Sequence, residues 1–172
     1  DLQVCDMPEN RHLLDHIHLE LTDEHSTNAI LDSLSLHTQK CDILVNAAGI
    51  SEFGLFDDKD RSLFDRTMAV NLEAVARMTR NFLPLLRKSN QGRIINIGSI
   101  CSEFASPGLS AYVVSKHAVL GLTRALASEL GPEGITVNCI QPGAILTGIT
   151  ASSFEADPSF KEHWVNKSAI GR

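Results

Sequence analysis

Three short, largely apolar segments constrain the fold of this 172-residue chain more than any other feature. They cover residues 42–46, 94–97 and 135–140, and longer stretches of helical character separate them. Continuously apolar strands that alternate with helices are typical of a parallel sheet that is covered on both faces. The sequence therefore predicts an α/β fold, a doubly wound parallel sheet with helices on both faces.

Further elements are expected around these strands. Residues His16–Leu21 alternate between apolar and polar with a period of two, which predicts another strand. Asp23 is predicted as the N-cap of the helix that follows, Pro84 is a candidate kink, and Gly131-Pro132 predicts a helix end. The predicted helices cover about residues 23–36, 60–68, 71–88 and 109–130.

Length and composition predict one compact domain over residues 1–172. With 43% hydrophobic residues the chain has enough apolar material for a sizeable core. A net charge of −6 without a long basic run argues against nucleic acid or an anionic membrane as a partner. No apolar run approaches the roughly 18 residues of a membrane span, and no signal peptide opens the chain. A cytoplasmic protein with reduced thiols is expected, since no C-x-x-C links Cys5, Cys41, Cys101 and Cys139.

The segment Tyr112-Val113-Val114-Ser115-Lys116 contains the only tyrosine of the chain. In a helix, Tyr112 and Lys116 would lie one above the other on the same face, because they are four residues apart. A neighbouring ammonium favours the phenolate, so this pairing predicts a Tyr112 pKa below its ordinary value of about 10. The pair is therefore a candidate proton-transfer group.

Polar and small residues follow each of the three predicted strands. Asn46, Ser99 and Pro142-Gly143 come directly after the strand ends. Ligands of doubly wound sheets bind outside the carboxyl ends of the strands, so these loops are expected to meet at one crevice. The long helix would bring Tyr112 and Lys116 toward the same place.

In these motifs and in their order, the chain resembles the short-chain dehydrogenase/reductase family. The resemblance runs from about Leu19 to Arg172. The Asn-Asn-Ala-Gly turn of the family appears here as Asn46–Gly49, with alanine in the second position. Its Pro-Gly-x-x-x-Thr segment falls on Pro142–Thr147. Its catalytic tetrad falls on Asn71, Ser99, Tyr112 and Lys116.

The resemblance implies an NAD(P)-dependent oxidoreductase that interconverts a secondary alcohol and a carbonyl by hydride transfer. It implies that Tyr112 donates or accepts the proton, and that Ser99 hydrogen-bonds the same substrate oxygen. Lys116 would hold the cofactor ribose, and Asn71 would anchor a water that links Lys116 to solvent. The residues expected at the cofactor are Glu20, Leu21, Asn46, Ala47, Gly49, Tyr112, Lys116, Pro142, Gly143, Ile145 and Thr147.

The two ends of the chain depart from the family pattern. The family begins with a strand and a Thr-Gly-x-x-x-Gly-x-Gly loop that holds the pyrophosphate, and it closes with a further helix and strand. None of these is matched, which implies the middle of a larger protein or a partial sequence. Glu20 matches the acid at the end of the family's third strand. Asp1 stands about where the second-strand acid would fall, with no arginine after it, which favours NAD over NADP.

Two other functions stay open at this point. A protein of this family could bind nucleotide without turnover, although the intact tetrad argues against it. The same fold could also support an epimerase or a dehydratase. Substrate specificity is expected in Cys101–Gly108 and in Gly148–Lys167, where Phe154, Phe160 and Trp164 would form a lid or a subunit contact.

Neither a metal site nor a hydrolase triad is predicted. His16 and His18 share one strand face, but no third ligand has metal-site spacing. Gly98-Ser99-Ile100 lacks the Gly-x-Ser-x-Gly pattern of a nucleophile elbow, and His117 precedes no suitable acid at a strand end, so a triad of Ser99, His117 and an acid is discarded.

Apolar positions are left over on the helices predicted at residues 71–88 and 109–130. Leu85, Leu120 and Ala125 are examples, and they look too numerous for a solvent face. The resemblance implies that these two helices pair with those of a second subunit. A homodimer at least is expected, and a homotetramer is the larger alternative.

Overall fold

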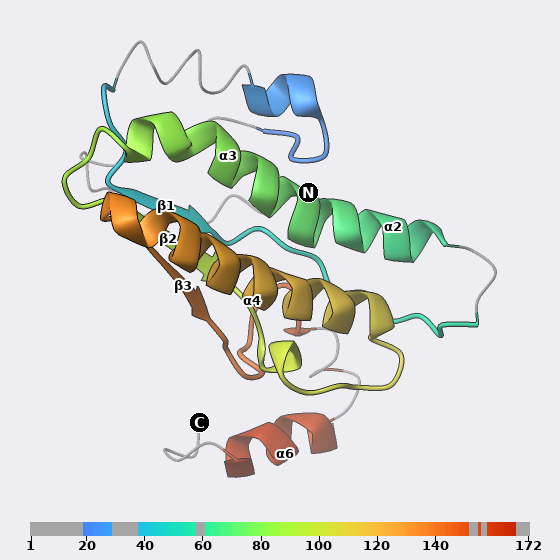
Figure 1. The fold of residues 1–172 in the computed structure, drawn as a ribbon. Helices are drawn as coiled ribbons and strands as arrows, with labels where there is room; N and C mark the ends of the chain where they lie inside the picture. Colours follow the sequence, from blue (N-terminus) through green and yellow to red (C-terminus); the bar gives the residue numbers. More distant parts are fainter. Residues whose placement is uncertain (1–18, 29–37, 58–60, 152–154, 156–157, 168–172) are drawn as a thin grey trace, which may run out of the picture.

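The computed structural model describes residues 19–28, 38–57, 61–151, 155 and 158–167. Three parallel strands form its sheet in the order β1-β2-β3 (Figure 1). Leu44 lies opposite Ile94, which lies opposite Val137, so apolar side chains form a row across the sheet. The sheet confirms the predicted α/β class, and its strands are β1 (Ile43–Asn46), β2 (Arg93–Ile97) and β3 (Thr136–Ile140).

Helices α3 (Ala74–Leu86) and α4 (Ser110–Leu130) cover one face of the sheet (Figure 1). Strand side chains alternate between the two faces, so every second residue points at these helices. The core lies there, and its buried members are Leu44, Leu86, Ile94, Leu130, Ile135 and Val137. The other face remains open among the described residues, where Ile43, Val45 and Ile140 are 58%, 52% and 51% exposed.

A buried set of hydrogen bonds crosses the layer between sheet and helices. The Asn46 amide donates to Thr79 Oγ1 at 3.1 Å and to Asn96 Oδ1 at 2.8 Å. The Asn96 amide donates in turn to Thr123 Oγ1 at 2.9 Å. All four residues are buried, so these bonds compensate the desolvation of their polar groups. They tie α3, β1, β2 and α4 together near the carboxyl ends of the strands.

Helix α2 (Ser62–Met68) continues into α3 through a π-helical turn, η1 (Ala69–Glu73). The residues at both junctions keep right-handed helical dihedral angles, so one helix runs from Ser62 to Leu86. The prediction of two separate helices is therefore wrong at this junction. A π-turn widens the helix locally without ending it, and such turns are frequent at functional sites. Pro84 lies inside α3, which continues beyond it to Leu86.

Helix α4 ends at Leu130 with Gly131 as its C-cap, as the sequence predicted. After Leu130 the chain continues into a 3₁₀ turn, η3 (Gly131–Glu133), and Gly131 keeps helical dihedral angles. Gly134 has the positive φ of 79° that ends the turn, a conformation that glycine adopts without steric cost. A last helix, α6 (Pro158–Lys167), lies apart from the sheet (Figure 1).

The predicted strand at His16–Leu21 is only partly testable, because residues 16–18 lie outside the described part. Leu19 and Glu20 form no strand, and a turn follows at Leu21 and Thr22. The Glu20 carboxylate accepts hydrogen bonds from the Thr22 amide and hydroxyl, and such local bonds compete with strand pairing. The N-cap prediction is confirmed, since the Asp23 carboxylate accepts from the amides of His25 and Ser26.

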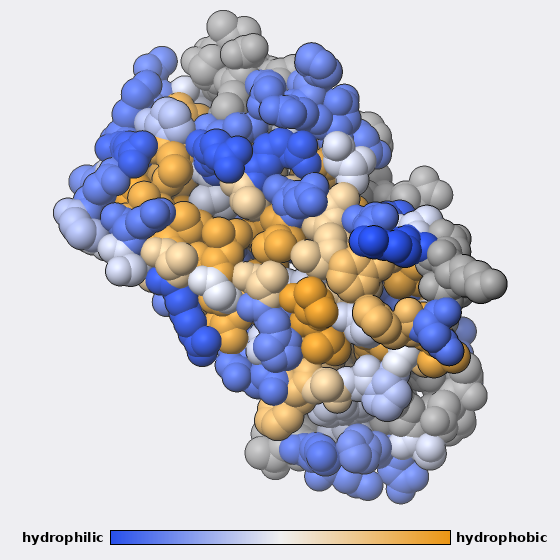
Figure 2. All heavy atoms as spheres, turned by 45° about the vertical axis from the view of Figure 1, so that its right-hand side comes forward, coloured by the Kyte–Doolittle hydropathy of each residue, from blue (hydrophilic) through white to orange (hydrophobic). Residues whose placement is uncertain are grey.

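The surface retains large apolar side chains, among them Phe53, Leu55, Phe56 and Phe104. Figure 2 shows apolar residues gathered across the middle of the face in view, with polar residues around them. The predicted free face of the two long helices needs correction. Leu85 and Leu120 are each only 7% exposed, because they pack inside the chain, whereas Ala125 and Val114 are exposed.

Candidate active site

A pocket of about 790 Å³ lies where the three strands end. Its walls come from the turn after β1, the end of β2, the first turns of α4 and the segment after β3. The loops after parallel strands thus meet at one edge, as the sequence predicted. The predicted site residues that line this pocket are Ala47, Gly49, Ser99, Tyr112, Lys116, Pro142, Gly143, Ile145 and Thr147.

Ser99 begins the short 3₁₀ turn η2 (Ile100–Ser102) directly after β2. Its hydroxyl oxygen accepts a hydrogen bond from the Cys101 amide at 3.1 Å, and its carbonyl accepts from the Ser102 amide at 2.8 Å. The Ser99 side chain is buried, and it lines the same pocket as Tyr112. The turn therefore holds the Ser99 hydroxyl in a defined direction, beside the phenol.

Lys116 lies one helical turn beyond Tyr112 on α4, as the spacing predicted. Its Nζ lies 5.6 Å from the centroid of the Tyr112 ring and donates a hydrogen bond to the Ile97 carbonyl at 2.8 Å. Lys116 is only 5% exposed, so its ammonium is held between β2 and the pocket. An ammonium has three N–H donors, and the bond to Ile97 uses one of them.

The ionisation of Tyr112 differs from the prediction. Burial raises the pKa of Tyr112 above its ordinary value, and the influence of the Ser99 hydroxyl opposes this rise only in part. The nearby Cys101 thiol pushes the Tyr112 pKa in the same upward direction as burial. Burial also lowers the pKa of Lys116, because the charged ammonium loses hydration. The predicted downward shift of the Tyr112 pKa is therefore wrong in direction, and the phenol is protonated at neutral pH.

Asn71 lies in the π-helical turn η1 and is 1% exposed. Its amide nitrogen donates to the Ile50 carbonyl at 2.9 Å and to Ser115 Oγ at 3.0 Å. Its amide oxygen accepts from the Ile50 amide at 2.8 Å. Both N–H donors of the side chain are thus engaged, so Asn71 clamps the loop after β1 to α4. Its side-chain oxygen, which accepts one hydrogen bond, keeps a second lone pair, so the expected role of Asn71 as a water anchor stays a prediction.

Gly49 allows the loop after β1 to approach the polar groups below the pocket. A Cβ at this position would lie 3.3 Å from Asn71 Oδ1 and 3.6 Å from Lys116 Nζ. A side chain here would fill the space above the ammonium. The glycine therefore leaves Lys116 open to whatever occupies the pocket.

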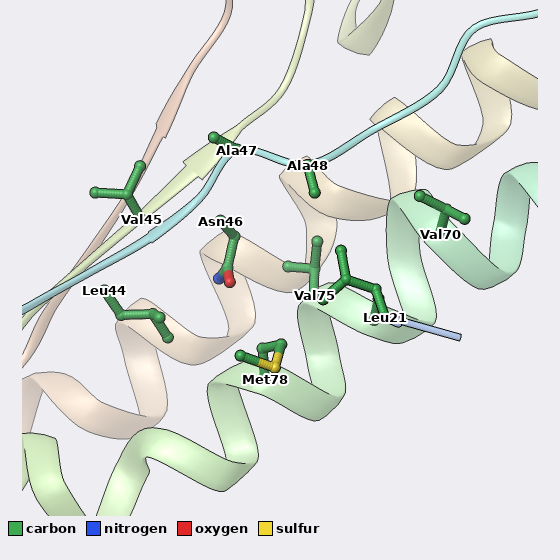
Figure 3. Close-up of a pocket in the computed structure, with 10 residues that line it drawn as sticks. Leu21, Leu44, Val45, Asn46, Ala47, Ala48, Val70, Val75 and Met78 are labelled. Carbon is green, nitrogen blue, oxygen red and sulfur yellow. The ribbon is translucent and has the colours of Figure 1, made fainter. Parts of the chain in front are cut away.

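A second, smaller pocket of about 110 Å³ lies beside the first, and Figure 3 shows the residues that line it. The end of β1 and the turn after it form one wall, while η1 and α3 form the other, together with Leu21. Asn46 lies between these walls, with its amide engaged by Thr79 and Asn96. Ala47 lines both pockets, so the two pockets are adjacent along the same edge.

Residues 148–150 of the expected substrate segment line the large pocket, and Thr150 Oγ1 donates to the Ile145 carbonyl. Trp164 lies on α6 with its ring edge-to-face against His163, whereas Phe154 lies outside the described residues. His16, His18 and Cys5 also lie outside them. Cys41, Cys101 and Cys139 are free thiols.

In the described part of the chain, histidine, cysteine and acidic side chains do not gather in groups of three or more that could bind a metal ion. None of its helices combines the length and the apolar character that crossing a bilayer requires.

A family model described as short chain dehydrogenase matches residues 4–158, which is most of the chain. This chain belongs to the short-chain dehydrogenase family. The match covers the strands β1–β3 and every residue of the predicted tetrad.

Relatives within the short-chain dehydrogenase family agree with this assignment. A cyclopentanol dehydrogenase of Comamonas sp. (strain NCIMB 9872) is 34% identical over 143 residues, which are 83% of this chain and 57% of the relative. A D-beta-hydroxybutyrate dehydrogenase of Rhizobium meliloti (strain 1021) is 44% identical over 106 residues, 62% of this chain and 41% of the relative. The Pseudomonas aeruginosa RhlG/NADP active-site complex has a TM-score of 0.80 and 33% identity, covering 91% of this chain and 62% of that structure. The chain spans about half the length of the curated relatives it matches.

Two serines near the site were missed by the reasoning from sequence. Ser115 Oγ donates to the Tyr112 carbonyl at 2.7 Å and accepts from Asn71, so it joins α4 to η1. Ser102 Oγ joins the turn of Ser99 to α4. Ser115 lies within the Tyr112–Lys116 motif and Ser102 within the segment Cys101–Gly108, but their hydrogen-bond partners are distant in sequence, so no local signal identifies their roles.

Proposed function

We propose that this protein is an NAD(P)-dependent oxidoreductase that interconverts a secondary alcohol and a carbonyl, with Tyr112 as the proton donor or acceptor. One observation carries this proposal: the Ser99 hydroxyl, the Tyr112 phenol and the Lys116 ammonium line the same pocket, and the Lys116 Nζ lies 5.6 Å from the centroid of the Tyr112 ring. Two hydroxyl groups that converge beside a buried cation are suited to binding and protonating one substrate oxygen.

The proton step follows from the ionisation of the phenol. Since Tyr112 is protonated at neutral pH, it can give its proton to a carbonyl oxygen that becomes an alcohol oxygen. Ser99 would donate a hydrogen bond to the same oxygen and so stabilise the charge that develops on it. Lys116, 5.6 Å from the ring centroid, would stabilise the phenolate that remains until solvent returns a proton. In the oxidation direction the same groups would take up the proton of the alcohol.

The residues of the two pockets fit a dinucleotide. Lys116 has N–H donors besides the one bound to Ile97, and these suit ribose hydroxyls. The absent side chain of Gly49 leaves room above that ammonium. The apolar walls of the smaller pocket suit a flat base, and Ala47 connects it with the larger pocket. When bound, the nicotinamide supplies or accepts the hydride. Pro142, Gly143, Ile145 and Thr147 would form the wall beside it.

We propose that the protein prefers NAD to NADP. This preference rests on Asp1 and the lack of an arginine after it, because an acid at that place hydrogen-bonds the ribose hydroxyl and repels a phosphate. The RhlG structure of Pseudomonas aeruginosa is a complex with NADP, so both cofactors belong in the assay. A ratio of kcat/KM values that favours NADP would contradict the preference without affecting the proposed reaction.

Tyr112→Phe tests the reaction, because it removes the phenolic oxygen and keeps the ring. We expect kcat for carbonyl reduction to fall by about 10²–10⁴-fold, the usual contribution of general acid–base catalysis. Cofactor affinity, measured by titration calorimetry, should fall far less than turnover. His117→Gln is the matched control, since His117 lies on the same helix with an exposed side chain. Normal turnover of folded Tyr112→Phe protein would exclude the assigned role.

The same assay separates this reaction from the two alternatives. A protein that binds NAD(P) but turns over no member of a panel of secondary alcohols and ketones would be a nucleotide-binding protein. A product formed without net change in the redox state of the cofactor would indicate an epimerase or a dehydratase.

Location and assembly complete the proposal. We propose a cytoplasmic homodimer or homotetramer in which α3 and α4 face a second subunit. The exposed Val114 and Ala125 on α4 are candidates for that contact, in place of the buried Leu85 and Leu120. Apolar residues gathered on the surface in Figure 2 are typical of proteins that associate.

A further inference from the structure

Ser102 occupies an unusual position between two parts of the proposed active site. Its side chain is 1% exposed, and its hydroxyl makes two hydrogen bonds in opposite roles. Ser102 Oγ accepts from the Ser99 amide at 3.2 Å and donates to the Lys116 carbonyl at 2.9 Å. One buried hydroxyl therefore connects the backbone of Ser99 with the backbone of Lys116.

A second contact joins the same two segments. Lys116 Nζ donates to the carbonyl of Ile97, two residues before Ser99. The end of β2 and the first turns of α4 are thus connected on both sides of Ser99, once through Ile97 and once through Ser102. The approach is close, because a Cβ on Gly98 would lie 3.0 Å from Ser102 Oγ.

We propose that Ser102 is a positioning residue for the reaction. By holding the turn of Ser99 against α4, its hydroxyl sets the distance and direction from the Ser99 hydroxyl to the Tyr112 phenol. The inference rests on the proposed function of this site. Ser102 itself does not line the pocket, so it acts through Ser99 rather than on the substrate.

Thr123 shows what a purely structural hydroxyl looks like in this fold. Its buried Oγ1 also accepts from an N–H group, that of Asn96, and donates to a carbonyl of α4, that of Val119. Thr123 lies almost two helical turns beyond Lys116, and neither of its partners lines the pocket. Each of the two hydroxyls therefore satisfies one buried N–H donor and one buried carbonyl. Of the two, only the Ser102 hydroxyl connects Ser99 to the helix that carries Tyr112.

The ionisation of Tyr112 reports on this geometry. The groups that face Tyr112 are Lys116 on its own helix, together with Ser99 and the Cys101 thiol from the turn η2. The Cys139 thiol of β3 faces Lys116. The Ser99 hydroxyl lowers the Tyr112 pKa against the effect of burial. Any loosening of the Ser99 turn should move this hydroxyl away from the phenol, so the Tyr112 pKa should rise further.

The test compares Ser102→Ala with Thr123→Val. Each substitution removes a buried hydroxyl with two hydrogen bonds and adds no bulk that the site lacks. For Ser102→Ala we expect kcat to fall by about 10–100-fold, the effect of small misplacements at a reacting centre, with the cofactor Kd unchanged within about twofold. The limb of the pH profile that belongs to Tyr112 should move to higher pH. Thr123→Val should lower stability without either change.

A spectroscopic titration keeps this test independent of turnover. The absorbance of tyrosinate is followed against pH, and the same titration of the Tyr112→Phe protein is subtracted, so that Tyr112 alone is observed. We expect a higher Tyr112 pKa in Ser102→Ala than in the parent and an unchanged one in Thr123→Val. If the parent turns over no substrate, the proposed function fails, but this titration still decides the role of Ser102. An unchanged Tyr112 titration, or equal effects of the two substitutions on it, would overturn the inference.

Discussion

Gly98→Ala is expected to disturb the site from inside the sheet. A Cβ at Gly98 would lie 2.7 Å from Cys139 Sγ and 3.0 Å from Ser102 Oγ, well inside the usual separation of about 3.5–4.0 Å for non-bonded carbon atoms. The backbone cannot easily retreat, because the Gly98 amide donates to the Ile140 carbonyl at 2.8 Å. Overpacking of this kind costs about 1–3 kcal/mol of the free energy of unfolding. Since Gly98 precedes Ser99, we also expect turnover to fall by about 10–100-fold.

Urea denaturation and steady-state kinetics measure the two effects of Gly98→Ala. Gly121→Ala is the matched control, since nothing lies within 4 Å of a Cβ there, and in mid-helix it should raise stability by roughly 0.5–1 kcal/mol. The double variant Gly98→Ala/Cys139→Ala lacks the thiol that the new Cβ would meet. It should therefore be more stable, by a coupling energy of about 1 kcal/mol or more, than the sum of the two single effects predicts. The reasoning is refuted if Gly98→Ala keeps its stability within about 0.5 kcal/mol and its turnover, or if the coupling is absent.

Two further predictions concern the cation and the assembly. Lys116→Met removes the charge 5.6 Å from the centroid of the Tyr112 ring, so the Tyr112 pKa should rise further. The pH profile of residual alcohol oxidation should therefore move to higher pH, and calorimetry should show weaker cofactor binding. An unchanged profile would place Lys116 outside the proton step. Val114→Asp puts a charge on the exposed apolar part of α4 and should raise the dissociation constant of the oligomer in sedimentation experiments, by about tenfold or more, whereas the exposed Ser128→Asp should not. A parent protein that sediments as a monomer would contradict the predicted assembly.

The strands and the meeting of their loops could be predicted because the signals are local. Residues 42–46, 94–97 and 135–140 are largely apolar segments followed by small or turn-forming residues, and parallel pairing then places all three ends at one edge. The order of Asn71, Ser99, Tyr112 and Lys116 along the chain then identified the family. Three of these four line one pocket, while Asn71 lies beneath it.

Other features depend on tertiary contacts that no local pattern encodes. The continuous helix from Ser62 to Leu86 follows from a π-turn whose Asn71 is bonded to Ile50 and Ser115, both distant in sequence. Leu85 and Leu120 looked like leftover surface on a helical wheel, yet they are buried. The helices of this layer pack against the sheet and against each other. A count of their apolar positions therefore cannot show which side of each helix stays exposed to solvent.

The direction of the Tyr112 pKa shift also could not be predicted from the sequence. A spacing of four residues correctly places Lys116 beside the phenol, but a pKa is set by the balance of charge, hydrogen bonding and desolvation. Burial removes hydration from the phenolate and from the ammonium alike, so it raises the pKa of Tyr112 while it lowers that of Lys116. The phenol therefore holds its proton at neutral pH, and the arrangement suits proton donation to a carbonyl oxygen. For the proposed oxidation of an alcohol, Tyr112 must instead be a phenolate. A ligand in the pocket would then have to strengthen the interactions of Ser99 and Lys116 with this phenolate.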